Sequence, residues 1–300
     1  MRKRSRSVSS AMFNADPKIH TVLFGEFACE VWFPVSLPGV PVESGRIFVC
    51  SHCVRFLPNK ESWHWHIGNC SFRKRCCGHE ISRDRNKTFS VCVLDGRKPS
   101  CSPIAQRISL LTKLFLEHKM TLDDVHFFYY FALFETRADG TRHFCAYFSK
   151  EICRQSAENN NLSCLMVLPP YQSKGYGRFL IELSYAMTAM EGSLGTPERP
   201  FSDAGRRAYV SFWSENVVRA LEKMNENKCP VTISAICEKT SMIPEDVICA
   251  LQQYNLVRVA GKNQPFLVVP ASLVEKVTER SLCQRPSVLS APLQWTPNRN

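Results

Sequence analysis

A loop with two closely spaced glycines, Gln172-x-x-Gly175-x-Gly177, is the most informative chemical pattern in this sequence. The apolar run Leu162 to Leu168 ends at two prolines just before the loop, and residues Arg178 to Met187 after it have a helical pattern. This order predicts a strand, a loop and a helix N-terminus. Glycines let a ligand approach the backbone, and the first N–H groups of a helix attract anions. The loop is therefore predicted to hold an anionic group.

Three cysteines and a histidine have the spacing of a zinc site, Cys50-x2-Cys53-x12-His66-x3-Cys70. Two thiolates two residues apart fit one tight turn, and four such ligands complete a closed, structural tetrahedral site. A metal of this kind can stabilise a segment too small to fold alone. The alternative is chance spacing in a chain with 15 cysteines. Five further residues lie close enough to substitute as ligands: His52, His64, Cys76, Cys77 and His79.

Three carboxylates after the glycine loop are candidates for a general base, which removes a proton from a reacting group. Glu182 lies on the predicted helix and reads as a solvated helix residue, and Glu191 reads as a surface residue. Glu198 lies in the loop Gly195-Thr-Pro-Glu-Arg-Pro200, where two prolines fix the backbone and a side chain can be aimed. The residues alone favour Glu198 only modestly.

The surrounding sequence supplies the elements that would position these groups. Strand-like runs precede the loop, and the turn signal Asp139-Gly140 separates two of them. A helical stripe of apolar residues runs from Ile104 to His118, and Ser202 is placed to cap a helix after the catalytic candidates. Two short helices and a hairpin then suggest a winged-helix-like module. The expected strands are Thr88–Leu94, Phe127–Glu135, His143–Ser149 and Leu162–Leu168, the expected helices Thr232–Lys239 and Pro244–Tyr254, and the expected hairpin Leu256–Val259 with Phe266–Val269.

Length and composition set the broad class. The chain has 300 residues, a net charge of +11 and a 44% hydrophobic content, which fit a globular protein with acidic partners such as a phosphorylated cofactor, nucleic acid or chromatin. No apolar segment is long enough for a signal peptide or a bilayer span, so we expect no membrane association and a reducing compartment in which most cysteines are small buried hydrophobes. The basic start, Met1 to Arg6, is either a nuclear address or a loose tip.

Several segments resemble motifs of one protein family and follow one another along the chain in the same order as in that family. This resemblance decides between the functional interpretations. They are Phe24-Gly, the zinc cluster, Leu114–Lys119, Phe144–Glu151, Asn160–Tyr185, Gly195–Gly205 and Pro244–Ile248. Together they are similar to the MYST family of histone acetyltransferases, over about residues 20–270. The resemblance implies an α+β fold, in which a GNAT-like acetyltransferase core is flanked by an N-terminal CCHC zinc finger region and a C-terminal winged-helix-like module.

The resemblance also implies roles for individual residues. Glu198 matches the family's general base for the substrate lysine, and Cys164 matches its active-site cysteine, proposed as an acyl-accepting nucleophile or as a neighbour that shapes the site. Lys119 matches a lysine that the family autoacetylates. Acetyl-CoA would be the cosubstrate and zinc a structural metal held by Cys50, Cys53, His66 and Cys70. The residues expected to contact acetyl-CoA are Leu165, Met166, Val167, Gln172, Ser173, Lys174, Gly175, Tyr176, Gly177, Arg178, Ser202 and Ser211.

Each of these roles has a structural alternative. Cys164 in an apolar strand reads as a core thiol, Lys119 as an exposed lysine at a helix end, Ser202 as a helix cap and Ser211 as a helix-face residue. The chain also departs from the family pattern. Ser173 stands where the family usually has an arginine, which predicts a weaker pyrophosphate contact. Leu122, Asp123 and Phe127 stand where it usually has two tyrosines and a proline, which affects the expected substrate choice and rate.

The sequence thus predicts a nuclear, acetyl-CoA-dependent protein lysine acetyltransferase acting on histone tails and nucleosomes, with direct attack by the lysine amine. Subunits of a chromatin-modifying complex and non-specific DNA phosphate contacts are the other expected partners. The rivals are a catalytically weakened MYST-like subunit of such a complex, an acetyltransferase for non-histone proteins or small amines, and a DNA-binding protein. The expected parts are a basic tail (1–18), an N-terminal strand region with the zinc finger (19–80), a catalytic core (81–215), the C-terminal module (216–280) and a flexible tail (281–300).

Overall fold

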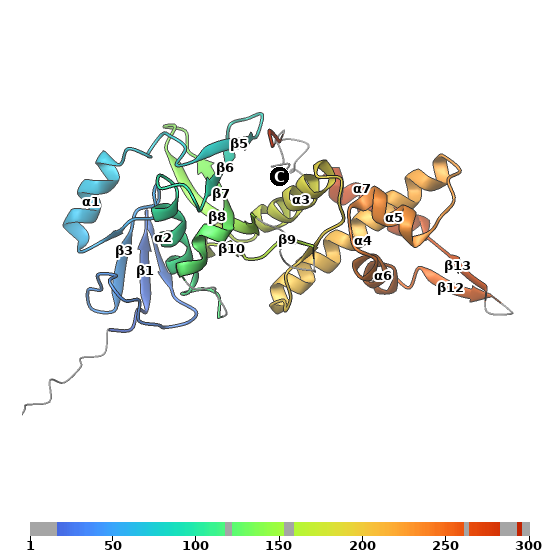
Figure 1. The fold of residues 1–300 in the computed structure, drawn as a ribbon, viewed down its shortest axis with the longest axis horizontal. Helices are drawn as coiled ribbons and strands as arrows, with labels where there is room; N and C mark the ends of the chain where they lie inside the picture. The colour runs from blue at the N-terminus through green and yellow to red at the C-terminus, as the bar shows by residue number, and fades with distance from the viewer. Residues whose placement is uncertain (1–16, 118–121, 153–158, 261–263, 283–292, 296–300) are drawn as a thin grey trace, which may run out of the picture.

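The apolar runs between residues 79 and 167 form a five-stranded antiparallel sheet at the centre of the computed structural model (Figure 1). The strand order is β10-β8-β7-β6-β5. The two longest strands bury nearly every side chain because helices or loops cover both faces of the sheet. The structure describes residues 17–117, 122–152, 159–260, 264–282 and 293–295. The strands of this sheet are β5 His79–Arg83, β6 Phe89–Asp95, β7 Phe128–Thr136, β8 Arg142–Glu151 and β10 Leu165–Val167.

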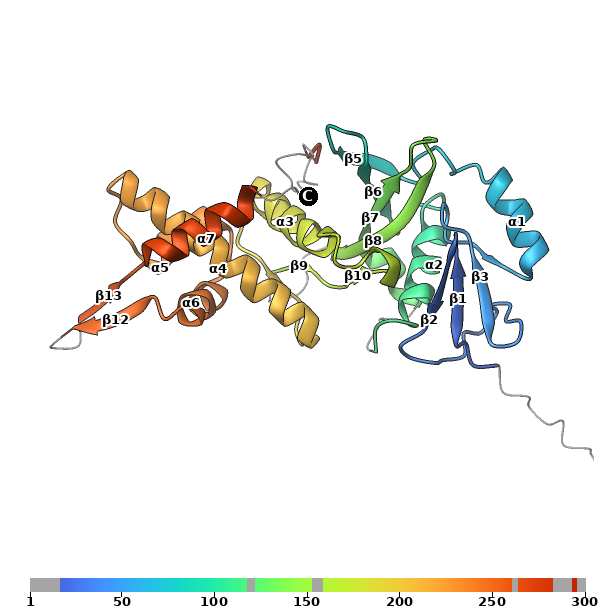
Figure 2. The same ribbon diagram turned by 180° about the vertical axis from the view of Figure 1, so that it is seen from behind.

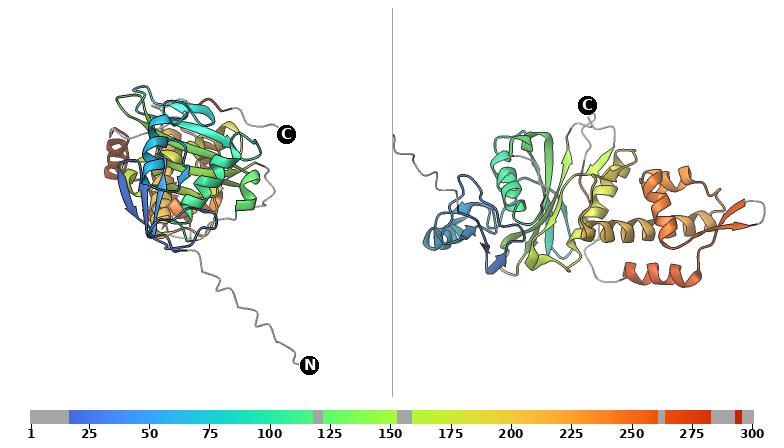
Figure 3. Two further views of the ribbon diagram at one scale, coloured as in Figure 1. Left: turned by 90° about the vertical axis from the view of Figure 1, so that its left-hand side faces the viewer. Right: turned by 90° about the horizontal axis from the view of Figure 1, so that it is seen from below.

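Two helices lie on opposite faces of the central sheet (Figure 3). On one face, Ser109 of α2 hydrogen-bonds to the Tyr130 hydroxyl across 2.8 Å. On the other, Phe179 of α3 packs edge-on against Phe89, with ring centroids 5.0 Å apart. The helix that follows the glycine loop is therefore anchored on the sheet, which fixes the position of the loop. These helices are α2 Ser102–Thr112 and α3 Tyr176–Met190, and the short 3-10 segments are η1 Leu122–Phe127 and η2 Pro169–Tyr171.

The N-terminal region is a second, four-stranded sheet with one helix, and it lies at one end of the molecule (Figure 1). Its order is β2-β1-β3-β4, with β1 and β3 parallel and the other neighbours antiparallel. Asn59 caps the helix by accepting from the Ser62 N–H at 2.9 Å. The elements are β1 Thr21–Phe24, β2 Phe27–Glu30, β3 Arg46–Val49, β4 Phe56–Leu57 and α1 Lys60–Asn69.

A long helix, α4, leads from the core to a C-terminal module at the opposite end (Figure 2). Trp213 and Val217 of α4 are buried against apolar residues of the module, including Met242 and Leu251. The order of helix, helix and hairpin agrees with the sequence prediction, and a further helix, α7, follows it. The elements are α4 Asp203–Glu226, α5 Ile233–Thr240, α6 Pro244–Gln253, β12 Val257–Ala260, β13 Gln264–Leu267 and α7 Ala271–Leu282. In the described part of the chain, no helix has the length and apolar character needed to cross a bilayer.

A short C-terminal segment returns to the central sheet. Leu293 forms an antiparallel bridge with Ser82 of the edge strand β5, and Trp295 packs edge-on against Tyr129 and Phe131 of β7. These residues lie within 281–300, for which the sequence suggested a flexible tail. The half-buried Trp295 ring thus joins residues 293–295 to the central sheet through two aromatic contacts.

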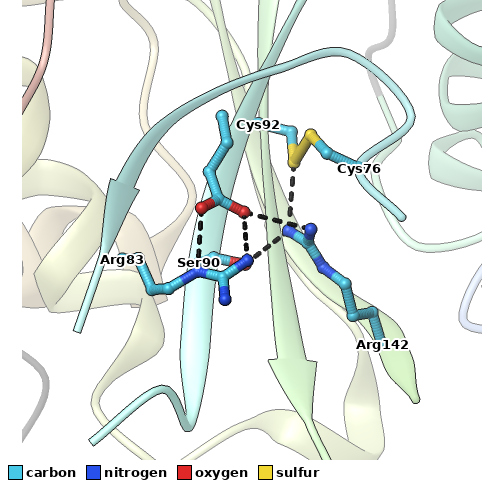
Figure 4. Close-up of a disulfide and its surroundings, with 6 residues drawn as sticks. Cys76, Arg83, Ser90, Cys92 and Arg142 are labelled. Atoms are coloured by element: carbon cyan, nitrogen blue, oxygen red, sulfur yellow. Dashed lines mark hydrogen bonds and ion pairs between the residues drawn. A yellow bond between two sulfur atoms is a disulfide. The ribbon is translucent and has the colours of Figure 1, made fainter. Parts of the chain in front are cut away.

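A disulfide between Cys76 and Cys92 is a feature that the sequence analysis did not identify (Figure 4). The Arg142 guanidinium donates to the Cys92 sulfur at 3.2 Å and to the Ser90 hydroxyl, and it pairs with Glu80 at 3.0 Å. Cys76 is thereby removed from the possible substitute zinc ligands. The other described cysteines are free thiols, most of them buried, as the sequence analysis expected.

Candidate functional site

The sequence analysis expected one strand over Leu162–Leu168. The structure instead has two short strands, with a break at Ser163 and Cys164. Strand β9 (Asn160–Leu162) pairs in parallel with β11 (Thr196–Pro197), whereas β10 pairs with β8. The Ser149 hydroxyl accepts from the Cys164 N–H at 3.2 Å, and the Ser149 N–H donates to the Cys164 carbonyl at 2.9 Å. Because the chain changes partners here, Cys164 lies in a half-buried position at the point where the two strands diverge.

Glu198 reaches the same point from a distant part of the sequence. Pro197 of β11 is in register with Leu162 of β9, and the Glu198 N–H donates to the Leu162 carbonyl at 2.8 Å. Cys164 follows Leu162 by two residues, so the backbones of Glu198 and Cys164 both lie at the end of β9. Glu198 is half-buried, which lets it meet a ligand while staying anchored.

The glycine loop has the backbone shape that the sequence predicted. Gly175 is the N-cap of α3 with φ +85°, a left-handed conformation that glycine adopts without strain. A Cβ added at Gly177 would lie 3.5 Å from the Val167 side chain and within 4 Å of no other group, so the backbone there stays open to a ligand. The first turn of α3 therefore presents its N–H groups at an accessible surface, as an anion site requires.

Strand β10 is an edge strand of the central sheet, bonded only to β8 among the described strands. An edge strand leaves one row of backbone N–H and C=O groups for a further extended partner. Leu165, Met166 and Val167, predicted to offer such bonds to acetyl-CoA, form this strand. The Gln172 amide donates to the Val167 carbonyl at 3.0 Å, which links the loop to the edge. Lys174 is exposed and pairs with Glu135 at 3.2 Å.

Arg178, predicted to wrap the pyrophosphate, contacts α4. Its guanidinium donates to the Glu215 carboxylate at 2.7 Å and lies 4.7 Å from the centre of the Phe212 ring. The Ser211 hydroxyl donates to the same carboxylate at 3.2 Å. The geometry thus couples the start of α3 to the middle of α4 through one buried anion.

Ser211 also lines a hollow of about 350 Å³ on the surface of α4 and α6. Two exposed arginines, Arg206 and Arg207, give this hollow a positive charge, which suits a phosphorylated ligand. Ser202 caps α4 by accepting from the Gly205 N–H at 3.1 Å. The capping role weighed for Ser202 is therefore present in the structure.

The four residues with zinc spacing converge in the N-terminal region. The ligand atoms of Cys50, Cys53, His66 and Cys70 all lie within 4.8 Å of one another, so they form a cluster that could hold one metal ion. The three thiols interact closely: hydrogen bonds from Cys50 and Cys70 lower the pKa of Cys53, and the pKa values of Cys50 and Cys70 are raised. A closed set of three sulfurs and one imidazole fits zinc, and it leaves no position for a reacting water.

Two expectations about other residues have different outcomes. Glu191, read as a surface residue, is instead part of a buried ion pair with Lys150 of β8 at 2.6 Å, because the end of α3 packs against the sheet. That pairing makes it a poor general base. Lys119 lies outside the described residues.

Three charged residues near the site had no clear signal in the sequence. Asp246 is fully buried in α6 and pairs with Arg199, while Glu215 is buried under Arg178. Asp246 occupies the first turn of its helix, where an acidic residue ordinarily reads as a favourable partner for the helix dipole. Only the packing of α6 against the loop after β11 shows its second role.

Comparisons with known proteins point to one family. A family model described as "MOZ/SAS family" matches residues 75–291. The "Histone acetyltransferase ESA1" of Gibberella zeae is 33% identical over 279 residues, covering 93% of this chain and 54% of that protein. The "Histone acetyltransferase mst2" of Schizosaccharomyces pombe is 34% identical, with 93% and 66% covered, and the "Histone acetyltransferase MOF" of Drosophila melanogaster is 31% identical, with 93% and 33% covered. The chain spans about half the length of the curated relatives it matches.

Proposed function

This chain belongs to the MOZ/SAS family, and on that premise we propose that it transfers an acetyl group from acetyl-CoA to lysine side chains of histone tails. The observation that supports the proposal is the hydrogen bond from the Glu198 N–H to Leu162 at the end of β9, two residues before Cys164 and next to the edge strand that leads into the glycine loop. The names of the relatives support the reaction and the histone substrate.

The chain's own residues supply three things that the reaction needs. The open edge of β10 and the N–H groups at the start of α3 would hold the cosubstrate, whose thioester supplies the acetyl group. Ser202, Ser211 and the charged hollow beside them would contact its outer part. Glu198 would accept a proton from the lysine ammonium, because only the neutral amine is a nucleophile. Cys164 acts in this proposal as a neighbour that shapes the site, with direct attack by the amine.

The metal and the remaining partners follow from the same proposal. Zinc held by Cys50, Cys53, His66 and Cys70 would be structural, since all four positions are protein ligands. The enzyme would act in the nucleus as part of a chromatin-modifying complex, with its net charge of +11 available for contacts with DNA phosphates. Lys119 would be its autoacetylation site.

An acetyl-transfer assay on histone tails and nucleosomes tests the function. Glu198→Gln is expected to lower kcat/KM by about 10²- to 10⁴-fold because it removes the base. The matched control is Glu182→Gln on α3, the rival carboxylate, which should keep its activity. Equal activity of the Glu198→Gln variant and the wild type would remove Glu198 as the base.

Cys164→Ala separates the two chemical routes. If Cys164 is the nucleophile, its replacement should lower kcat by orders of magnitude. If Cys164 only shapes the site, kcat should fall far less. A wild-type protein that binds coenzyme A but transfers no acetyl group would support the rival reading as a catalytically weakened subunit. That reading is favoured by the departures from the family pattern at Ser173 and within residues 120–127.

A further inference from the structure

The residue after Glu198 is bound to a carboxylate in the C-terminal module. The Arg199 guanidinium donates to Asp246 Oδ1 of α6 at 2.7 Å. The arginine side chain is 53% exposed, while the aspartate side chain is completely buried. The ion pair therefore connects the accessible loop that contains Arg199 to a buried residue of the C-terminal module.

The surroundings of Asp246 make its charged carboxylate depend on the ion pair with Arg199. Burial raises the pKa of the Asp246 carboxyl to about 6, and contacts with Thr196 and Arg199 oppose that rise. Tyr185 of α3 and Tyr209 of α4 also face the carboxyl, and Glu245 is its charged neighbour on α6. A buried carboxylate is stable only with good partners, so the charged form depends on Arg199.

Further contacts fix the loop around Glu198. The Gly195 N–H donates to the Ser241 carbonyl of the C-terminal module at 3.0 Å, and the Glu198 N–H donates to Leu162 of the core at 2.8 Å. The Arg199 guanidinium also lies 5.0 Å from the centre of the Phe201 ring, which stacks on Tyr209. Glu198 is thus held by the core on one side and by the module on the other.

We propose that Asp246 is a positioning residue for acetyl transfer, which acts through Arg199 to fix the backbone that aims the Glu198 carboxylate. The C-terminal module then completes the active site of the core, in addition to any contact with partners. This inference rests on the proposed function for its kinetic consequence, but the fixing of the loop is a property of the chain itself. A general base must be aimed closely, because a misplacement of about 1 Å can cost about 100-fold in rate.

The first test is kinetic. Asp246→Asn and Arg199→Gln are each expected to lower kcat for lysine acetylation by about 10-fold or more, while KM for acetyl-CoA changes by less than about twofold. The double variant should be no worse than either single variant, because both remove one interaction. Arg199→Lys keeps the charge and should restore most of kcat. Glu245→Gln is the matched control, since it removes an exposed carboxylate one residue away from Asp246 on the same helix.

The second test does not need activity. Amide hydrogen exchange in residues 195–202 should be faster in Arg199→Gln than in the wild type, whereas exchange in the strands of the central sheet should be unchanged. Arg199 is half exposed, so this variant remains informative if Asp246→Asn fails to fold. Unchanged exchange of the loop, or a kcat in Arg199→Gln equal to that of the wild type, would overturn the inference. Faster loop exchange in Arg199→Gln, together with no acetyl transfer by the wild type, would support the positioning and reject the proposed function alone.

Discussion

Arg178 in the first turn of α3 and Glu215 in the middle of α4 form an ion pair with a separation of 2.7 Å. The Glu215 side chain is 1% exposed and that of Arg178 is 14% exposed, so the pair is largely removed from water. Arg178, which the family resemblance assigns to the pyrophosphate of acetyl-CoA, therefore connects α3 and α4 through this ion pair. The N–H groups of the loop are left as the main predicted anion ligands.

Arg178→Gln should consequently affect stability more than cofactor affinity. It leaves the buried Glu215 with Ser211 and with Arg219, whose guanidinium lies 3.9 Å away, and we expect a loss of about 3 kcal/mol in the free energy of unfolding. The double variant Arg178→Gln/Glu215→Gln should recover part of this loss, because no buried charge remains. Urea unfolding and calorimetric titration with coenzyme A measure the two effects. A large rise in Kd with unchanged unfolding would instead mean that the guanidinium contacts the cofactor.

Ser173→Arg is expected to strengthen acetyl-CoA binding. Ser173 is exposed in the glycine loop with φ +61°, a left-handed conformation. Serine already adopts this conformation, and arginine, also a residue with a Cβ, would have to adopt the same one. An added guanidinium beside a pyrophosphate should lower Kd about fivefold, or ~1 kcal/mol. The gain should shrink in high salt because the site is exposed to solvent. Ser173→Gln, of similar length but uncharged, is the control, and an equal gain in that variant would contradict the electrostatic explanation.

Removal of zinc should unfold the N-terminal region selectively. Chelation is expected to lower the melting temperature, and Cys53→Ser should reduce the bound zinc below one ion per chain, because a closed site needs all four ligands. Cys77→Ala is the matched control, since this buried thiol lies nearby in sequence but outside the cluster. Metal analysis of the purified variants measures the outcome. Loss of zinc from Cys77→Ala with retention in Cys53→Ser would show that the ligand set is wrong.

His143 should make the protein less stable in mild acid. Burial, assisted by Arg137 and His52, lowers the pKa of His143 to about 4, below the ordinary value of about 6.5. The unfolded chain therefore binds the proton more readily, so the stabilisation is fully present above pH 6.5 and is lost as pH falls toward 4. Between pH 7 and pH 5 the expected loss is about 2 kcal/mol.

Urea unfolding at the two pH values tests this expectation. His143→Gln should show a smaller decrease than the wild type, whereas His126→Gln, which changes an exposed histidine, should behave like the wild type. Zinc release in acid affects all three proteins alike, so the comparison between them isolates His143. Identical pH profiles for wild type and His143→Gln would refute the assignment.

Local patterns in the sequence predicted much of the fold. The strands at 88–94, 127–135 and 143–149, the helix after the glycine loop and the two helices of the C-terminal module all appear within a few residues of their expected bounds. The four zinc-ligand candidates also converge as their spacing required. These features were accessible because apolar periodicity, glycine positions and ligand spacing depend on neighbours along the chain.

The departures occur where distant segments meet. The run Leu162–Leu168 has one continuous apolar pattern, but it splits at Cys164 because β9 pairs with β11 and β10 with β8. Glu191 has the sequence context of a surface residue and is buried only because Lys150 lies under the end of α3. Neither the split of this run nor the burial of Glu191 can be predicted from composition or from the spacing of apolar residues.

The sequence by itself thus indicated the glycine loop and the four zinc-ligand candidates from their spacing, and its resemblance to the MYST family singled out Cys164 and Glu198 for the proposed acetyl transfer. The tertiary structure decided what fixes them in place, through the pairs Arg178–Glu215 and Arg199–Asp246. The physical reason is that each pair joins a buried carboxylate to an arginine 37 or 47 positions away, and the burial and geometry that stabilise it exist only after the chain has folded.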